Sequence, residues 1–130
     1  MFSHAQIEKV LESVGTDFPR LVKELLNLGV LSFEHIVPTG TVTFYGTSTH
    51  RITIHRKQKI IEVHKTPSSE KLKEALTFLK SGKSDLPTFC MDAAEAGVEK
   101  WLCDLINMKV TYFDKRNKTI MIENIPLVNP

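Results

Sequence analysis

Apolar and polar positions repeat with two different periods along this chain, and each change of period marks the boundary between a helical and an extended segment. Apolar residues recur every three to four positions in four stretches, which predicts amphipathic helices over residues 3–13, 17–29, 69–81 and 85–97. After the second and the fourth stretch the period becomes two, which is typical of strands with one buried face. The predicted strands cover residues 30–37, 41–45, 51–55, 98–105, 109–113 and 119–123, with a further strand at 59–65.

The two helices that precede the strands begin and end with the same residue types. Each has an aspartate before its first turn, a proline inside that turn and a glycine after its last turn: Asp17, Pro19 and Gly29, then Asp85, Pro87 and Gly97. The aspartates are predicted N-caps, because a carboxylate accepts hydrogen bonds from the free N–H groups of a first turn. Glycine readily takes the left-handed conformation of a C-cap. Ser68 or Ser69 is the predicted cap of the helix over 69–81.

The chain also aligns with itself. Residues 17–54 lie over residues 85–122 without a gap, and eight positions are identical, where average residue usage gives roughly two or three. We interpret the match as a duplication of a helix-helix-strand-strand-strand unit, with one copy at about 3–65 and the other at about 69–126. A unit of this size has a marginal core, so the two copies are predicted to form one domain over 1–130 around a pseudo-two-fold axis.

Short connections between the strands predict an antiparallel sheet with the helices packed on it, which is an α+β fold. The alternation in the third strand of each copy places four isoleucines on one buried face of this sheet: Ile52, Ile54, Ile120 and Ile122.

Composition narrows the class of protein. The formal net charge is only +2, which does not indicate a strongly basic nucleic-acid binder. Two cysteines are too few for a disulfide framework or a zinc cage, and no other spacing is diagnostic of a metal or a cofactor, so neither is predicted. The N-terminus lacks a signal-peptide layout and no apolar run approaches the roughly 20 residues of a membrane span. We therefore expect a reduced, cytoplasmic protein that does not enter the membrane.

A histidine and two thiols are the candidates for catalysis. His35 falls on the same strand face as Phe33 and Val37, and its counterpart in the second copy is Cys103. If the pseudo-two-fold axis brings the first strands of the two copies together, His35 and Cys103 approach each other, and a thiolate–imidazolium pair is a recognised nucleophile. Cys90 is the other candidate thiol. The alternative is that these are satisfied core positions, since a buried cysteine usually behaves as a small hydrophobe, and we favour this alternative.

One basic interval is a candidate for nucleic-acid binding. No carboxylate occurs between Glu34 and Glu62, and the same interval contains four basic residues that have no equivalent in the second copy: Arg51, Arg56, Lys57 and Lys59. A basic hairpin at 51–59 is able to follow a phosphate backbone. Lysines on a solvated hairpin also keep an edge strand from pairing with other strands, and four charges are few for a nucleic-acid footprint. We favour this structural role and expect weak nucleic-acid binding at best.

Several short motifs carry a family resemblance. The segments "AAEAGVEKW" with the following "DL", "TYFDK" and the closing "IP" in the second copy, and "FP", "LGV" and "TGTVTFYG" in the first, resemble the YdfO-like family of small bacterial proteins. This is a domain of unknown function often encoded in prophages, and some members carry the label "phage envelope protein". The resemblance implies an α+β fold with an internal duplication and supplies no catalytic residues. It also implies an apolar residue, often valine, at the position of Cys103.

Three hypotheses about function follow. The leading one is a small cytoplasmic, non-catalytic binding or accessory protein, of prophage origin as the resemblance implies, that acts as a monomer or homodimer on an unidentified protein partner. The first alternative is a small enzyme that uses Cys103 or Cys90 with a histidine at the pseudo-two-fold axis. The second is a weak nucleic-acid binder that uses residues 51–59.

Overall fold

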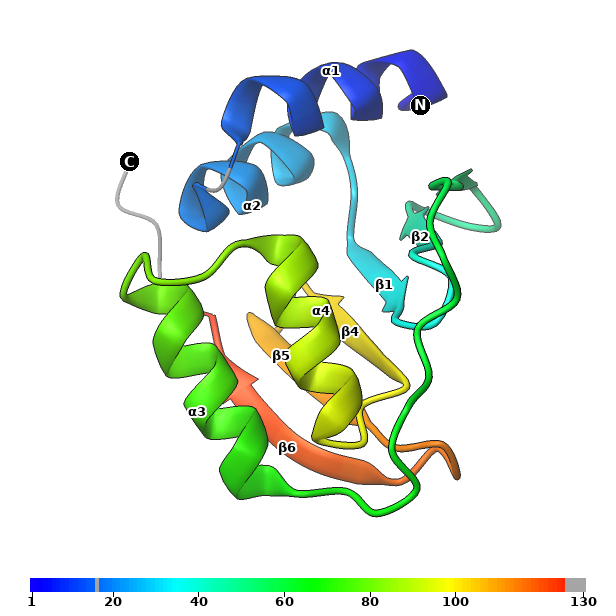
Figure 1. Cartoon of the computed structure of the whole chain (residues 1–130). Helices are drawn as coiled ribbons and strands as arrows, with labels where there is room; N and C mark the ends of the chain where they lie inside the picture. The colour runs from blue at the N-terminus through cyan, green and yellow to red at the C-terminus, as the bar shows by residue number, and fades with distance from the viewer. Residues whose placement is uncertain (16, 126–130) are drawn as a thin grey trace.

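The computed structural model describes residues 1–15 and 17–125 and has helices and strands in the order that the periodicity predicts (Figure 1). The first half of the chain contains α1 (His4–Val14), α2 (Phe18–Leu28), β1 (Ser32–Ile36), β2 (Val42–Tyr45) and β3 (Arg51–Ile54). The second half contains α3 (Ser69–Lys80), α4 (Leu86–Glu95), β4 (Lys100–Asp104), β5 (Lys109–Phe113) and β6 (Thr119–Asn124). The predicted α+β fold is confirmed.

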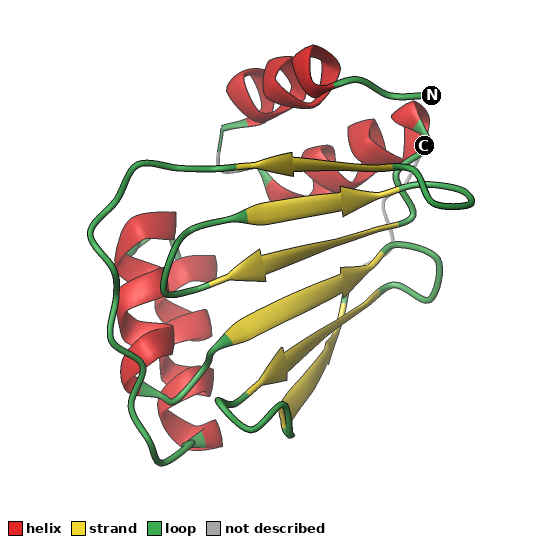
Figure 2. Cartoon of the chain, turned by 90° about the vertical axis from the view of Figure 1, so that its right-hand side faces the viewer, coloured by secondary structure: helices red, strands yellow, loops and turns green. Residues whose placement is uncertain are grey.

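The strands form one antiparallel sheet in the order β3-β2-β1-β4-β5-β6 (Figure 2). The two halves meet at the β1–β4 pair, where Glu34 lies opposite Leu102. These two residues are equivalent positions of the two copies, and the pairs on either side of them are arranged symmetrically, with Ser32 opposite Asp104 and Ile36 opposite Lys100. A pseudo-two-fold axis drawn between Glu34 and Leu102 therefore relates the sheet pairings on its two sides. That the halves arose by duplication stays a prediction.

One face of the sheet is buried. Burial alternates along β1, β2, β4 and β5, so that every second side chain is covered. In Figure 1, α3 and α4 lie side by side over β4, β5 and β6, and α1 and α2 lie side by side near the N-terminal half of the sheet. Buried side chains from these helices and from the covered sheet face form one continuous hydrophobic cluster, in which Val22, Leu25, Phe44 and Leu72 are almost fully buried.

The predicted caps of α2 and α4 are confirmed. The side chain of Asp17 accepts a hydrogen bond from the N–H of Arg20, and that of Asp85 accepts one from the N–H of Thr88. Gly29 and Gly97 have φ values of 98° and 85°, in the left-handed region. The same two backbone hydrogen bonds close each helix, and the valine that follows each glycine is fully buried. Ser68 is the N-cap of α3.

The predicted burial of Ile122 is wrong, because its side chain is 57% exposed. In the first half Phe44 pairs with Ile52, so an undisturbed repeat would pair Tyr112 with Ile120. Instead, Tyr112 pairs with Met121, and an irregularity follows between Tyr112 and Phe113. A shift of one residue exchanges the two faces of a strand. Ile122 therefore lies on the open face, while Ile52, Ile54 and Ile120 stay buried or partly buried.

The predicted strand over 59–65 is also wrong. This segment is extended but pairs with no strand of the described chain, and it belongs to the connection from β3 to α3. Its backbone is held by single bonds to other elements: the N–H of Ile61 donates to the carbonyl of Pro38, and that of His64 donates to the carbonyl of Ala94. The connection has to cross from one edge of the sheet to the far helix pair (Figure 2), so it cannot run along a strand.

Candidate functional site

The structure brings His35 together with Cys90 in the core. His35 projects from the covered face of β1, and Cys90 projects from α4, which packs on that face. The Sγ atom of Cys90 lies 3.6 Å from the Nε2 atom of His35, and both residues are buried. The imidazole of His35 also stacks on the indole of Trp101, with the ring centroids 4.3 Å apart and the planes 16° from parallel. The pair is thus fixed on three sides by β1, β4 and α4.

Cys103, the partner that the pseudo-two-fold axis suggested for His35, occupies a different place. It lies opposite Phe33 in the β1–β4 pair, whereas His35 lies opposite Trp101. The two residues are therefore diagonal neighbours on the same face, and Cys103 is 1% exposed. The hydrogen bond of His35 within the described chain goes to Cys90. The helix that packs over the sheet, rather than the neighbouring strand, supplies the thiol.

Burial holds both members of the pair in their neutral forms. Desolvation, with a smaller contribution from the positive charge of Arg56, lowers the pKa of His35 from 6.5 to about 4. Desolvation also raises the pKa of Cys90 to about 11, and the charge of Arg56 offsets only part of this effect. Burial, followed by the negative charge of Glu123, raises the pKa of Cys103 further still. At neutral pH the site therefore contains a thiol and a neutral imidazole, the opposite of an activated thiolate–imidazolium pair.

The basic residues of the interval 51–59 do not form a hairpin. Arg51 lies on β3 opposite Tyr45, and Arg56, Lys57 and Lys59 lie in the extended connection that follows. All four side chains are exposed. Gln58, between them, donates hydrogen bonds to the carbonyls of Val37 and Pro38 and so ties this part of the connection to the β1–β2 turn.

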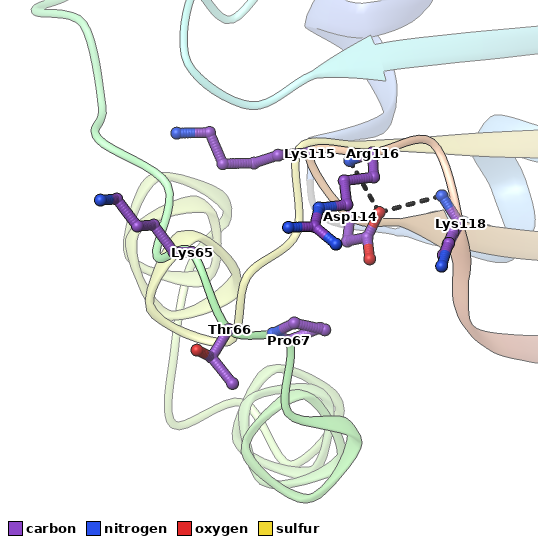
Figure 3. Close-up of a pocket in the computed structure, with 7 residues that line it drawn as sticks. All are labelled: Lys65, Thr66, Pro67, Asp114, Lys115, Arg116 and Lys118. Atoms are coloured by element: carbon purple, nitrogen blue, oxygen red, sulfur yellow. Dashed lines mark hydrogen bonds between the residues drawn. The ribbon is translucent and has the colours of Figure 1, made fainter.

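A cavity that the sequence did not suggest lies between the connection and the β5–β6 turn (Figure 3). It has a volume of about 490 Å³, and its lining consists of Lys65, Thr66, Pro67, Asp114, Lys115, Arg116 and Lys118. Neither His35 and Cys90 nor the second thiol, Cys103, line it. The cavity forms from segments about 50 residues apart in the chain, and for this reason the sequence gave no local signal of it.

Two further properties bear on the class of protein. The part of the chain that the structure describes contains no group of three metal-ligating side chains that is able to hold a metal ion. Within the same residues, no helix has the length and apolar character needed to cross a membrane.

Comparison with known proteins places the chain in a family. A family model described as "Protein of unknown function (DUF1398)" matches residues 6–124. The chain is also 23% identical over 120 residues to the uncharacterized protein YcgX of Escherichia coli (strain K12), and the match covers 91% of this chain and 90% of that protein. Neither description mentions the YdfO-like family or a phage envelope, so that part of the resemblance stays a prediction.

Proposed function

We propose that this chain, which belongs to the DUF1398 family of proteins of unknown function, is a small non-catalytic binding or accessory protein. The observation that carries the proposal is the state of the buried pair. Cys90 and His35 lie 3.6 Å apart, yet burial favours the neutral form of each. The pair therefore serves the core as a weak hydrogen-bonded contact between a thiol and an imidazole.

The magnitude of the pKa changes supports this role. With a pKa of about 11, only about one thiol in ten thousand is ionised at pH 7. Thiol nucleophiles of enzymes instead have a pKa below that of free cysteine or an adjacent base that is able to take the proton. His35 is adjacent, but its pKa of about 4 makes it a weak base. His35 stacks on Trp101 and faces the thiol of Cys90, so its ring completes the packing of β1 against α4.

The setting and the partner belong to the same proposal. Two free thiols buried in the core suit a reducing compartment, which supports a cytoplasmic location. The outer edges of β3 and β6 have no neighbouring strand within the described chain, and an exposed sheet edge is a common docking place for a partner protein. An origin in a prophage rests on the family resemblance alone.

Alkylation of the thiols tests the non-catalytic role. The protein is treated with iodoacetamide at pH 7, once in native buffer and once in urea, and the modified cysteines are identified by mass spectrometry. We expect both thiols to react at least about 100-fold more slowly in the native protein, because burial lowers the thiolate fraction and the access of the reagent. The variants Cys90→Ala and Cys103→Ala separate the two rates.

Rapid native alkylation of Cys90 that is lost in His35→Phe would contradict the proposal, because it would reveal a thiol activated by the histidine. Equally slow alkylation of Cys90 in the presence and absence of His35 supports it.

A further inference from the structure

Positive charge is concentrated at one end of the sheet. Strands β1, β3 and β5 end there, and so the connection over residues 55–67 and the β5–β6 turn over residues 114–118 lie at the same end, on the left in Figure 2. These two segments contain seven basic and two acidic residues, a net charge of +5. The rest of the chain has ten basic and thirteen acidic residues, a net charge of −3. The small net charge of the whole chain is therefore the sum of a strongly positive end of the sheet and a negative remainder.

Four of these cations surround the cavity at this end: Lys65, Lys115, Arg116 and Lys118. The cavity is open to solvent on one side, and its volume of about 490 Å³ leaves room for a small molecule. The ion pairs of the described chain involve other basic residues, so these four side chains are available to a ligand. An arginine among lysines suits a phosphate group, because its planar guanidinium donates two parallel hydrogen bonds to phosphate oxygens.

The wall made by Thr66 and Pro67 is held in place. The N–H of Ser68 donates to the carbonyl of Ala96 at 2.8 Å, and the N–H of Thr66 donates to the imidazole of His64. Gly97 packs so closely that a Cβ atom there would lie 2.7 Å from the Cα atom of Pro67. A fixed wall reduces the conformational entropy that a ligand loses on binding.

The opposite wall is fixed by Asp114. Its Oδ1 atom accepts hydrogen bonds from the N–H groups of Arg116 and Lys118, at 2.8 and 2.9 Å. This arrangement positions the turn from which Lys115, Arg116 and Lys118 project (Figure 3). Both bonds go to Oδ1, and Figure 3 shows the second carboxylate oxygen of Asp114 among the cavity side chains without such a bond.

A carboxylate oxygen among four cations selects the kind of anion. The unprotonated oxygens of a phosphate group are attracted by Lys65, Arg116 and the other cations and repelled by Asp114. A phosphate ester with several hydroxyl groups has donors for this carboxylate that lie apart from the phosphate, whereas inorganic phosphate at neutral pH offers only its own P–OH group. A nucleic-acid strand needs a row of phosphate contacts along a surface, whereas these cations line one cavity formed by two segments.

We propose that this cavity binds a small phosphorylated molecule with hydroxyl groups, such as a sugar phosphate. The phosphate lies among Lys65, Lys115, Arg116 and Lys118, and a hydroxyl donates to Asp114. This inference rests on the proposed binding role and names the chemical class of a ligand. A phosphomonoester brings about −1.5 to −2 charges and three acceptor oxygens, and the four cations with Asp114 more than neutralise this charge.

Isothermal titration calorimetry of the full chain with three probes tests the inference: ribose 5-phosphate, inorganic phosphate and ribose. We expect ribose 5-phosphate to bind more tightly than phosphate, and ribose to give no signal. In the double variant Arg116→Gln/Lys118→Gln, affinity for ribose 5-phosphate should fall about tenfold or more, because at least one charge-assisted hydrogen bond is lost. The control Lys9→Gln/Lys23→Gln removes the same charge from α1 and α2 and should leave affinity unchanged.

The variant Asp114→Asn separates the two halves of the recognition. Asparagine retains an oxygen that accepts the two turn N–H groups, but it removes the negative charge. We expect weaker binding of ribose 5-phosphate together with unchanged or tighter binding of inorganic phosphate. If the substitution instead disrupts the β5–β6 turn, the binding of both ribose 5-phosphate and inorganic phosphate should weaken. Thermal unfolding followed by circular dichroism identifies that case.

Several results would overturn the inference. The first is no heat of binding with ribose 5-phosphate, even at about ten times the concentration used for the other probes. The second is an equal loss of affinity in Arg116→Gln/Lys118→Gln and in the control variant. The third is a single-stranded oligonucleotide that binds more tightly than ribose 5-phosphate and depends on Arg56, Lys57 and Lys59. Failure here leaves the non-catalytic role standing, because that role is judged by alkylation of Cys90. Rapid alkylation of Cys90, in turn, leaves the calorimetric result unaffected.

Discussion

Replacing Gly97 by alanine should destabilise the protein far more than replacing its counterpart Gly29. The two glycines have similar left-handed φ values, and the N–H of each donates the same kind of hydrogen bond to a carbonyl in the last turn of its helix. Their surroundings differ. A Cβ atom on Gly29 meets no atom within 4 Å, whereas one on Gly97 lies 2.7 Å from the Cα atom of Pro67 and 3.0 Å from the carbonyl oxygen of Thr66. Because these are backbone atoms, they cannot relieve the clash by a change of rotamer, as a side chain can.

The expected magnitudes follow from these surroundings. The left-handed conformation costs an alanine about 1–2 kcal/mol, of which roughly 0.4–1 kcal/mol is recovered because alanine restricts the unfolded chain. Gly29→Ala should therefore lose about 1 kcal/mol. At Gly97 the chain must also move the linker at Pro67 away, and overpacking of this kind costs about 1–3 kcal/mol more. Gly97→Ala should therefore lose about 2–4 kcal/mol.

Urea unfolding followed by circular dichroism measures both losses as free energies of unfolding. Asparagine variants provide the matched control, because asparagine tolerates a left-handed φ but has a Cβ atom. Gly29→Asn should be more stable than Gly29→Ala. Gly97→Asn should gain little over Gly97→Ala, since the contact with Pro67 involves the Cβ atom that both residues share. Equal losses for the two alanine variants, or full recovery by Gly97→Asn, would refute the close approach of the linker to α4.

Two further predictions concern pH. The folded-state pKa of His35 is about 4, below its unfolded value of 6.5, so the free energy of unfolding should fall by roughly 3 kcal/mol as the pH drops from about 6.5 to 4. In urea unfolding, the stability of His35→Phe should depend less on pH over this range. The same pH dependence in both proteins would contradict the burial of the imidazole. The hydrogen bonds from Thr88 lower the pKa of Asp85, so the stability that its carboxylate contributes is present above the unfolded pKa and is lost as the pH falls through the folded pKa. In thermal melts, Asp85→Asn should therefore lose less stability than the unchanged protein below pH about 4. The same loss of stability in both proteins would count against the cap.

Local chemistry explains how much of the fold could be predicted from the sequence. Helix ends depend on a few neighbouring residues, so Asp17, Asp85 and the two C-cap glycines indicated α2 and α4 correctly. Strand periodicity identified β1 to β6. The face of β6 could not be predicted, because the irregular pairing beside Tyr112 depends on a neighbouring strand. This shift turns Glu123 to the helix side, where it pairs with Lys80 of α3.

The candidate site was predicted only in part. His35 was expected on a covered strand face and is buried, but its hydrogen bond goes to Cys90 and not to Cys103. Symmetry relates strands to strands, whereas the packing of α4 across the sheet depends on side chains from both. The cavity forms where residues 65–67 lie beside residues 114–118, and no local sequence pattern predicts that these two segments are in contact.

The protonation state of His35 tests the central claim most directly. A long-range ¹H–¹⁵N NMR spectrum of the native protein at pH 7 reports whether one or both ring nitrogens carry a proton. The neutral pair predicts a single protonated nitrogen, and the Cβ carbon shift of Cys90 should be that of a thiol. Two protonated nitrogens on His35, together with a thiolate shift for Cys90, would contradict the account and restore the catalytic alternative.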